Sequence, residues 1–468
     1  MGAKYEVSFW LNAWEKEMKN SRKLLAALAA TTILTVGSGV ALAGEGTEYN
    51  ISVWALAGPS DIYRIGAIEI AADQLEREYA VRGEAIHINI EGKPFTQWDE
   101  FRQGVTLAAE AGVAPNIVVA SHVDIAPWAQ SGLIVPVEDY VDLDAWPLNN
   151  IYPNLLEITS FQDQVWAIPQ DAESRPFFFW KPHMKAIGYS DADLDGLAER
   201  IRLGDYTLSD MLVDARKMID AGLVEENRGF WPRPSKGPDY WMFYMAFGGE
   251  MEDGNGRLLL DKTAMAEFYQ FFVDAVELGV ISKNHIGTPW DQWHGALTSG
   301  QVGMWQGGTW QYAEWTGKYG LDFFANASFS LVPGGGENGR ANTLTQPLVY
   351  LMTKQDDEEV MGIAADLITI ASEPRTNALH AVNSAHLGIS KAEEGVGLYA
   401  GDRWIREATP VLLPYASAQP NNVNFGQYFE VMFGGLQAAW TGQKTVDEAI
   451  ADVEAELRAA LGDNIVIR

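Results

Sequence analysis

The sequence predicts an α/β protein with at least two hydrophobic cores. Short strand-like runs are interleaved with longer segments in which apolar residues recur at helical spacing. Such alternation of strands and helices predicts a largely parallel sheet with both faces covered. The chain has 468 residues, which is more than one typical core holds, so we expect two or more lobes.

Each expected element follows from its own pattern. Apolar residues alternate with polar ones, or form a short buried run, in the predicted strands at 49–55, 85–90 and 117–120. The apolar spacing is helical in the predicted helices at 62–79, 97–111, 208–221, 239–247 and 262–278. Glycines gather at 254–256 and 334–336, and the second group predicts an exposed loop.

Residues 18–43 have the three regions of a secretory signal peptide. Cationic side chains at its start precede an apolar run at 24–36, and Ala41-Leu42-Ala43 gives the small-x-small pattern that a signal peptidase needs. We therefore expect cleavage before Gly44, with residues 1–17 a probable upstream extension. The alternatives are a real N-terminal extension or a membrane anchor, although the run is short for a membrane-spanning helix.

Cysteine is absent from the sequence, which removes several kinds of site. Disulfides, thiolate zinc sites and cysteine nucleophiles are excluded. A lipid-anchored exported protein would need a cysteine just after its signal. We therefore expect a protein that is secreted into the periplasm and not lipid-anchored.

The chain is strongly acidic, with a formal net charge of −30 at pH 7. Nucleic acid and anionic membrane surfaces would repel such a protein, so neither is an expected partner. Tryptophan and tyrosine are abundant, at 17 residues each. Flat aromatic faces are what sugar rings stack against, although most of these side chains are expected in the core.

Motifs for catalysis, metals and cofactors are scarce. The sequence contains no G-x-S-x-G elbow, no H-E-x-x-H helix and no phosphate-binding P-loop. The segment 191–196 opens like a calcium loop, but Arg202 occupies the position of the closing glutamate, so we expect a charged turn there. No acidic pair is singled out by spacing as a glycosidase dyad. We expect no catalytic residue, no metal and no cofactor.

Seven segments occur in a recognisable order along the chain. They are Ala114-Pro-Asn-Ile-Val-Val-Ala120, Trp128-Ala-Gln-Ser-Gly-Leu133, Pro136-Val-Glu-Asp-Tyr140, Gln164-Val-Trp-Ala-Ile-Pro169, the apolar run 176–180, Ala296-Leu-Thr-Ser-Gly-Gln-Val-Gly-Met304 with Gly307-Gly-Thr-Trp310, and Gly442-Gln-Lys-Thr-Val-Asp-Glu-Ala449. Their order and spacing resemble the extracellular solute-binding protein family 1 of ABC importers, the maltose-binding-protein-like sugar-binding proteins. The similarity spans nearly the whole chain after the signal segment.

The resemblance implies a periplasmic binding protein type II fold: two α/β lobes joined by a hinge, with the ligand cleft between them. Closure of such lobes around a polar solute exchanges its water for protein hydrogen bonds. By position, the lobes and crossings would be 48–169 plus 336–372 for lobe 1, 170–328 plus 375–468 for lobe 2, and 169–171, 331–335 and 372–374 for the crossings.

The resemblance also implies ligand contacts, carried over residue by residue. They are Ser60, Asp61, Ser121, His122, Asp124, Asp171, Glu173, Arg175, Tyr240, Trp241, Gly308, Trp310, Gln346 and Phe429. Trp310 matches the position where the family stacks an aromatic ring on a sugar, and Gly308, with Gly307, would let the backbone approach the ligand.

Structural alternatives remain open for several of these residues. Trp310 could be core, and Asp124 could cap a helix beginning at Ile125 instead of accepting sugar hydroxyls. Asp171, Glu173 and Arg175 could form a hinge ion pair. Phe429, or its neighbour Tyr428, could be core.

Departures from the family pattern narrow the ligand. Ala120 stands where relatives place an aromatic residue, and Gly58-Pro59 replaces a charged pair, so a linear maltodextrin is doubtful. Arg228, Arg233 and Lys236 could recognise an acidic or phosphorylated sugar together with Arg175. The alternative is ordinary surface charge.

The resemblance implies the periplasmic substrate-binding subunit of an ABC importer. It would be a monomer without catalytic activity that delivers a carbohydrate, such as an oligosaccharide, a monosaccharide derivative or a polyol, to the permease transmembrane subunits. Two alternatives are a secreted glycan-degrading hydrolase or lyase, and a binding protein that serves a chemoreceptor or sensor.

Overall fold

A computed structural model describes residues 46–57 and 63–468 of the chain. The expected signal peptide and its upstream extension lie outside the described residues, as do Ser60 and Asp61. Residues Thr47–Arg468 form one compact unit. None of the helices in the described part of the chain is long and apolar enough to cross a membrane.

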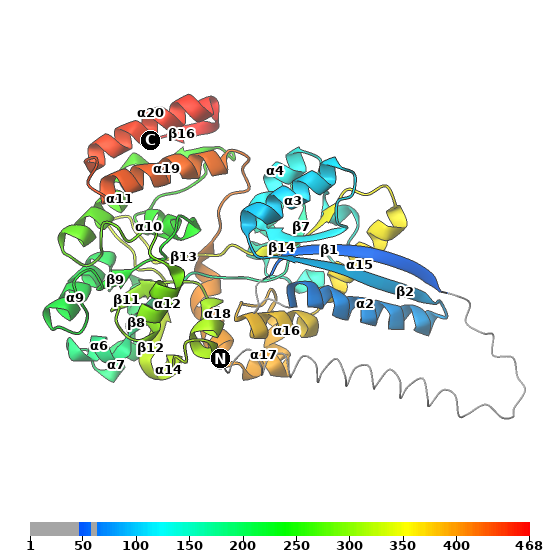
Figure 1. The fold of residues 1–468 in the computed structure, drawn as a ribbon, viewed down its shortest axis with the longest axis horizontal. Helices are drawn as coiled ribbons and strands as arrows, with labels where there is room; N and C mark the ends of the chain where they lie inside the picture. Colours follow the sequence, from blue (N-terminus) through cyan, green and yellow to red (C-terminus); the bar gives the residue numbers. More distant parts are fainter. Residues whose placement is uncertain (1–45, 58–62) are drawn as a thin grey trace, which may run out of the picture. The chain divides into compact units, whose positions relative to one another are not determined.

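The first main sheet has six strands in the order β2-β1-β3-β14-β4, and β7 also pairs with β14 (Figure 1). The strands are β1 (Thr47–Leu56), β2 (Ile86–Phe95), β3 (Ile117–Ser121), β4 (Ile134–Val135), β7 (Ala167–Pro169) and β14 (Leu348–Thr353). β1 runs parallel to β2 and β3, but the prediction of a largely parallel sheet holds only for these three strands, because the sheet as a whole is mixed. β14, which joins the sheet from a distant part of the chain, runs antiparallel to its three neighbours.

Both faces of this sheet are covered, which explains its continuous apolar strands. Side chains alternate along β3: Ile117 and Val119 pack into one core, and Val118 and Ala120 pack into another. Figure 1 shows α3 and α4 on one side of the sheet and α2 on the other. The helices of this region are α2 (Tyr63–Arg82), α3 (Trp98–Glu110), α4 (Ile125–Gln130), α5 (Pro153–Ile158), α15 (Glu358–Ala371) and α16 (Pro374–Ser384).

The second main sheet has four strands in the order β12-β8-β11-β9. These are β8 (Phe177–Trp180), β9 (Phe230–Trp231), β11 (Met304–Gln306) and β12 (Ala327–Ser330). Its core is aromatic: Phe178 of β8 stacks on Trp305 of β11, with ring centroids 5.4 Å apart, and meets Trp315 edge to face. Much of the tryptophan in the sequence is therefore structural.

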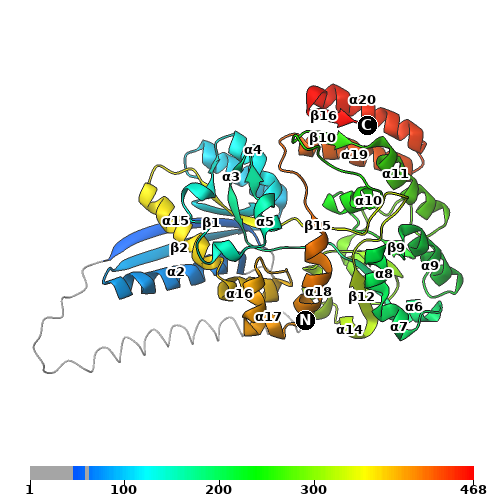
Figure 2. The same ribbon diagram turned by 180° about the vertical axis from the view of Figure 1, so that it is seen from behind.

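Helices surround this second sheet and continue to the C-terminus (Figure 2). They are α6 (Lys181–Ala186), α7 (Asp191–Asp195), α8 (Leu197–Leu203), α9 (Leu208–Asp220), α10 (Trp241–Ala246), α11 (Lys262–Glu277), α12 (Trp290–Thr298), α13 (Gln311–Gly317), α14 (Phe323–Asn326), α17 (Gly397–Gly401), α18 (Arg403–Leu412), α19 (Phe425–Trp440) and α20 (Val446–Leu461). Three short strand pairs complete the fold: β5 (Ser160–Phe161) with β6 (Gln164–Val165), β10 (Leu258–Leu260) with β16 (Ile465–Ile467), and β13 (Thr343–Leu344) with β15 (Ala416–Ser417).

Side-chain caps fix where several helices begin. Thr207 and Thr445 accept hydrogen bonds from backbone N–H groups at the starts of α9 and α20, and each forms a capping box with an acidic residue three positions on. Asp261 and Asp357 cap α11 and α15 in the same sense. The helix expected from residue 239 begins two residues later, at Trp241, because a 3-10 turn over Pro238–Tyr240 precedes it.

The chain passes between the two main sheets more than once. It leaves the first sheet after β7, enters the second at β8, and returns from β12 to β14. α16 still packs against α2 of the first region. Trp404 of α18, in contrast, lies in the aromatic core of the second region, where it stacks on Tyr312 at 4.7 Å between ring centroids.

Candidate functional site

A cavity of about 750 Å³ collects side chains from both main regions. Its lining from the first region includes Leu56, Arg64, Trp98, Arg102, Asp124 and Leu348. From the second region and the connecting segments come Glu173, Arg175, Arg233, Lys236, Asp239, Trp290, Trp310, Gln346, Gln419, Phe425 and Phe429. The cavity has the size and the mixture of aromatic and polar groups that a small-molecule site requires.

Arg175 and Arg233, which both line this cavity, share one buried carboxylate. Arg175 Nε lies 3.1 Å from Asp239 Oδ1, and Arg233 Nη1 lies 3.0 Å from Asp239 Oδ2. Burial raises the pKa of Asp239, but the Arg233 and Arg175 guanidiniums more than offset it and hold the pKa below its usual range. Asp239 therefore fixes two guanidiniums in place.

Arg175 is also tied to the first region. Its Nη2 donates to Glu173 Oε1 at 2.9 Å and to Gln346 Oε1 at 3.1 Å. The Gln346 amide donates in turn to Ser121 Oγ at 2.9 Å, at the end of β3. Ser121 does not line the cavity itself, but it orients Gln346, which does.

The Trp310 indole lies among cations and a second ring. The guanidiniums of Arg175 and Arg233 lie 5.0 Å and 5.2 Å from its ring centroid. His386 stacks on it with an interplanar angle of 12°. Arg233 also lies 5.0 Å from the ring of Trp290, so two indoles and two guanidiniums form one wall.

Asp124 is bound to an arginine and caps no helix through its side chain. It occupies the N-cap position of α4 without a side-chain cap hydrogen bond. Arg102 Nε donates to its Oδ1 at 2.7 Å, and the Arg102 guanidinium lies 4.9 Å from the ring of Trp98. Burial raises the pKa of Asp124 although Arg102 opposes that shift.

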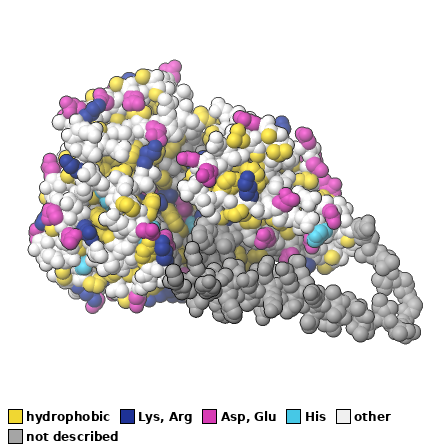
Figure 3. Space-filling view, viewed as in Figure 1, with side chains coloured by type: hydrophobic (Ala, Val, Ile, Leu, Met, Phe, Trp, Pro, Cys, Tyr) yellow, Lys and Arg dark blue, Asp and Glu magenta, His cyan; other side chains and the backbone are white. Residues whose placement is uncertain are grey.

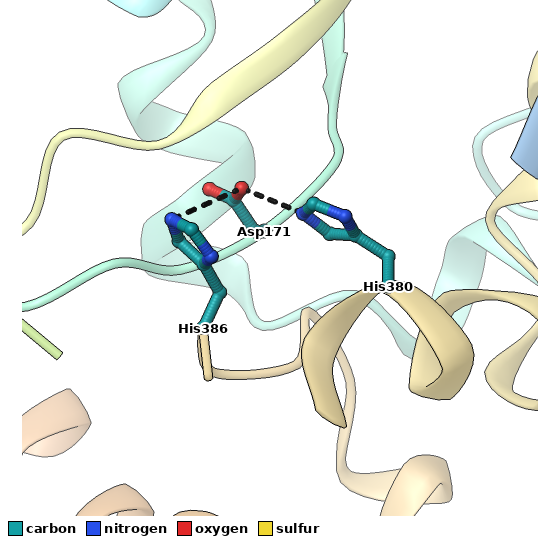
Figure 4. A group of neighbouring side chains, drawn as sticks. All are labelled: Asp171, His380 and His386. Carbon is teal, nitrogen blue, oxygen red and sulfur yellow. Dashed lines mark hydrogen bonds and ion pairs between the residues drawn. The ribbon is translucent and has the colours of Figure 1, made fainter. Parts of the chain in front are cut away.

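Asp171, His380 and His386 bring a carboxylate and two imidazoles within 4.8 Å of one another (Figure 4). His380 Nε2 lies 2.9 Å from Asp171 Oδ2, and the backbone N–H of Leu348 donates to Asp171 Oδ1 at 3.1 Å. Burial raises the pKa of Asp171, yet His386 and His380 outweigh it and hold the pKa at about 2.

This donor set is of a kind that binds divalent metals. Arg64, however, acts electrostatically on all three residues of the group, and a nearby cation opposes a metal ion. We therefore interpret the group as a buried hydrogen-bonded network. It fixes the segment after β7 and supports His386, whose Nε2 also lies 3.5 Å from Glu173 Oε2.

Four other expected contacts lie outside the cavity lining, namely Tyr240, Trp241, His122 and Gly308. Tyr240 and Trp241 are each 2% exposed and pack in the aromatic core, where Trp241 stacks on Tyr428 at 5.3 Å. His122 is buried, and its Nε2 lies 3.1 Å from the carbonyl oxygen of Gln419. Burial lowers the pKa of His122 to about 4.

Gly308 acts on the site through Trp310. A Cβ added at Gly308 would lie 2.2 Å from the Trp310 ring, so only glycine leaves room for the indole in this position. Its backbone N–H donates to Gln311 Oε1 at 2.7 Å.

The comparison with protein families decides the assignment. The model of the family described as bacterial extracellular solute-binding protein matches residues 73–372. The chain belongs to this family. Its members are binding proteins that act in the periplasm or outside the cell. No curated protein sequence matches the chain significantly.

Solved structures of solute-binding proteins share its fold. The GacH receptor of Streptomyces glaucescens, solved without ligand and with acarbose, superposes with a TM-score of 0.70 at 15% identity over 90% of this chain and 100% of that one. Maltose-bound MalE3 of T. maritima gives 0.69 at 17% identity over 88% and 99%. A solute-binding protein of Thermotoga lettingae bound with α-D-tagatose gives 0.67 at 16% identity over 88% and 100%. The predicted periplasmic-binding-protein fold is thereby confirmed.

Several residues that line the cavity of this solute-binding protein could not be predicted as ligand contacts from the sequence. Asp239, Trp290, Arg64 and Arg102 line the cavity but stand in no motif that marks a ligand contact. Asp239 directly precedes Tyr240, which the sequence does single out, so the sequence marks the turn that reaches the cavity but not the side chain of that turn that lines it.

A second, larger hollow of about 1120 Å³ lies near Gln419 and Asn422. None of the expected contacts that the structure describes lines it, and four of its lining residues are carboxylates: Glu157, Asp163, Glu250 and Glu252. The cavity around Trp310 is therefore the stronger candidate for the ligand site, because the expected contacts and the buried charge network converge there.

Proposed function

We propose that this protein is the substrate-binding subunit of an ABC importer and that it binds a carbohydrate in the cavity around Trp310. The observation that carries the proposal is the wall formed by Trp310, Trp290, Arg175 and Arg233. Indole faces bind the apolar faces of sugar rings, and fixed guanidinium, carboxylate and amide groups bind their hydroxyls.

Binding without turnover fits the charge pattern of the cavity. Each of the three carboxylates that line it in the described part of the chain is ion-paired with an arginine: Asp124 with Arg102, Glu173 with Arg175, and Asp239 with both Arg175 and Arg233. A glycosidase needs one carboxylic acid that gives its proton to the leaving oxygen and a second carboxylate across the bond. Carboxylates held by guanidiniums favour binding over that chemistry.

In this proposal the two main sheets belong to two lobes that close on the ligand. The lobes are 48–169 plus 336–372 and 170–328 plus 375–468, and segments 169–171, 331–335 and 372–374 act as crossings. The proposal is supported by the ties between the regions near the cavity, such as the hydrogen bonds that join Arg175, Gln346 and Ser121.

The proposed place of action is the periplasm, after cleavage of the signal peptide before Gly44. There the protein would act as a monomer and present its closed form to the transmembrane subunits of the permease. The acidic composition of the chain supports a freely diffusing role, since like charge opposes self-association.

Calorimetry combined with product analysis tests this function. We expect a panel of monosaccharides, disaccharides and polyols to contain at least one that binds to the purified protein, and chromatography of the equilibrated mixture to recover it unchanged. Release of shorter sugars would favour a glycan-degrading enzyme. Absence of binding across the panel would contradict carbohydrate transport.

A further inference from the structure

The cavity carries the opposite charge balance from the chain as a whole. The chain has a formal net charge of −30, and carboxylates are scattered over the face seen in Figure 3. Among the described residues, the cavity lining nevertheless has five cations and three carboxylates, namely Arg64, Arg102, Arg175, Arg233 and Lys236 against Asp124, Glu173 and Asp239.

The larger hollow shows that this enrichment is local. Among its lining residues Arg340 is the one cation, against the four carboxylates Glu157, Asp163, Glu250 and Glu252. A cavity with a positive excess in an acidic protein focuses its field on anions that enter.

The carboxylates of the cavity are already engaged. Asp239 is 1% exposed and serves Arg175 and Arg233 together. Lys236 pairs with Glu430, which does not line the cavity; both side chains are exposed, at 43% and 61%, so water weakens that pair. Lys236 therefore contributes positive charge to the cavity that its exposed partner offsets only weakly.

Some donor groups of Arg175 and Arg233 also have no hydrogen-bond partner among the described residues. Arg175 is 3% exposed, and among the described residues no acceptor bonds to its Nη1; the same holds for Arg233 Nε. An unmatched buried donor costs free energy. A carboxylate, sulfate or phosphate supplies only acceptor oxygens and pairs with guanidinium in two-pronged geometry, whereas a hydroxyl also brings a proton that needs an acceptor.

We propose that the carbohydrate bound by this protein is anionic, and that Arg175 and Arg233 hold its acidic group beside Trp310. This inference rests on the proposed function and specifies its ligand class. The shared chemistry is an oxyanion on a sugar ring, and its source is either a uronic acid or a phosphate ester.

Sugars that share a ring but differ in charge separate the contribution of the acidic group to binding affinity from that of the ring. The probes are glucose with glucuronate and glucose 6-phosphate, galactose with galacturonate and galactose 6-phosphate, and mannobiose with dimannuronate. We expect at least one acidic member to bind about 10- to 100-fold more tightly than its neutral counterpart in calorimetry. That preference should shrink as sodium chloride rises, because salt screens charge. The comparison of the uronates with the sugar phosphates shows whether the bound oxyanion belongs to a uronic acid or to a phosphate ester.

Two variants localise the effect. Arg233→Gln should lower the affinity for the acidic member much more than the affinity for the neutral member, so that most of the preference for the acidic member is lost. Arg458→Gln, which removes an exposed arginine paired with Glu454 on α20, is the control and should bind as the unmodified protein does. The salt dependence is read on the unmodified protein, so it stands even if Arg233→Gln folds poorly.

The outcomes separate this inference from the proposed function. Neutral members that bind as tightly as, or more tightly than, their acidic counterparts would overturn the anionic ligand and leave carbohydrate binding standing. Absence of binding by every member of the panel would overturn carbohydrate binding, and this inference with it.

Discussion

His386 stacks on Trp310, with ring centroids 6.0 Å apart and ring planes within 12° of parallel. His386 in turn stacks on His380, whose Nε2 is hydrogen-bonded to Asp171. The Trp310 indole is therefore in contact with the buried network formed by Asp171, His380 and His386. Because Asp171 lies two residues after the end of β7, these contacts connect Trp310 to the segment that joins the two main sheets.

Replacing Trp310 should weaken ligand binding while the fold persists. Trp310→Ala removes the ring that would lie against the sugar, and we expect a loss of about 1–3 kcal/mol of binding free energy. Trp310→Phe keeps a smaller aromatic face and should lose less. Calorimetry with a confirmed ligand measures both variants, and circular dichroism checks the fold. Equal affinity in all three proteins would mean that Trp310 is only structural.

Gly308→Ala should impair the same site through sterics alone. The new methyl group would meet the Trp310 ring at 2.2 Å, so the indole must rotate, and we expect at least about tenfold weaker binding. Gly317→Ala is the matched control, because a Cβ there has nothing within 4 Å. Wild-type affinity in Gly308→Ala would show that the observed Trp310 position is not needed.

The fold follows from local patterns where these are strong. The run 117–120 predicts a fully buried strand, and β3 is that strand, because both faces of its sheet are covered. The antiparallel direction of β14 cannot be predicted from the sequence in the same way. Its pairing with β3 joins residues such as Leu351 and Val118, and no local pattern fixes the direction of a strand contributed from so far along the chain.

A residue of the candidate site can be predicted from the sequence where a local motif identifies it. It cannot be predicted where its role depends on ion pairs with residues from other parts of the chain. Trp310 follows two glycines and could be singled out. Asp239 was missed because Arg175 and Arg233 give it its role, and spacing does not reveal that convergence. Tyr240 and Trp241 follow Asp239, and since successive residues of a helical turn point in different directions, the aromatic pair enters the core.

Glu393 should make stability fall as pH rises. Burial raises the pKa of Glu393 from 4.5 to about 8 although backbone N–H groups of Ile389 and Ser390 donate to it. The folded protein keeps this proton where the unfolded chain releases it. The stabilisation is complete below pH 4.5 and is lost as pH rises toward 8.

Glu393→Gln mimics the protonated form and should remove this dependence. We expect stability close to wild type at pH 5 and about 1–3 kcal/mol higher at pH 8, measured by urea unfolding. Glu394→Gln, at the exposed neighbouring position, should leave the stability unchanged at pH 5 and at pH 8. A variant that is equally destabilised at both pH values would mean that the folded protein already holds Glu393 ionised at pH 5, which would contradict its raised pKa.

Export should remove the N-terminal segment. The sequence at 18–43 predicts cleavage before Gly44, so osmotic shock of expressing cells should release a protein whose first residue, by Edman or mass analysis, is Gly44. Ala41→Arg and Ala43→Arg together should block processing, because the peptidase needs small residues there. Intact protein in the membrane pellet of wild-type cells would contradict a cleaved signal.

Ligand should make the protein more compact. The proposed crossings at 169–171, 331–335 and 372–374 would permit rotation of one lobe against the other while limiting twist, and a ligand that contacts both lobes favours the closed form by its differential affinity. Small-angle scattering should therefore show a smaller radius of gyration at saturation. Thermal unfolding should move to higher temperature, because the ligand binds the folded state. In Trp310→Ala, ligand at a concentration that saturates the wild-type protein should produce a smaller change in radius, since fewer molecules are occupied. A radius that stays constant at saturation, together with a raised melting temperature, would show binding in a rigid groove and would contradict the hinge.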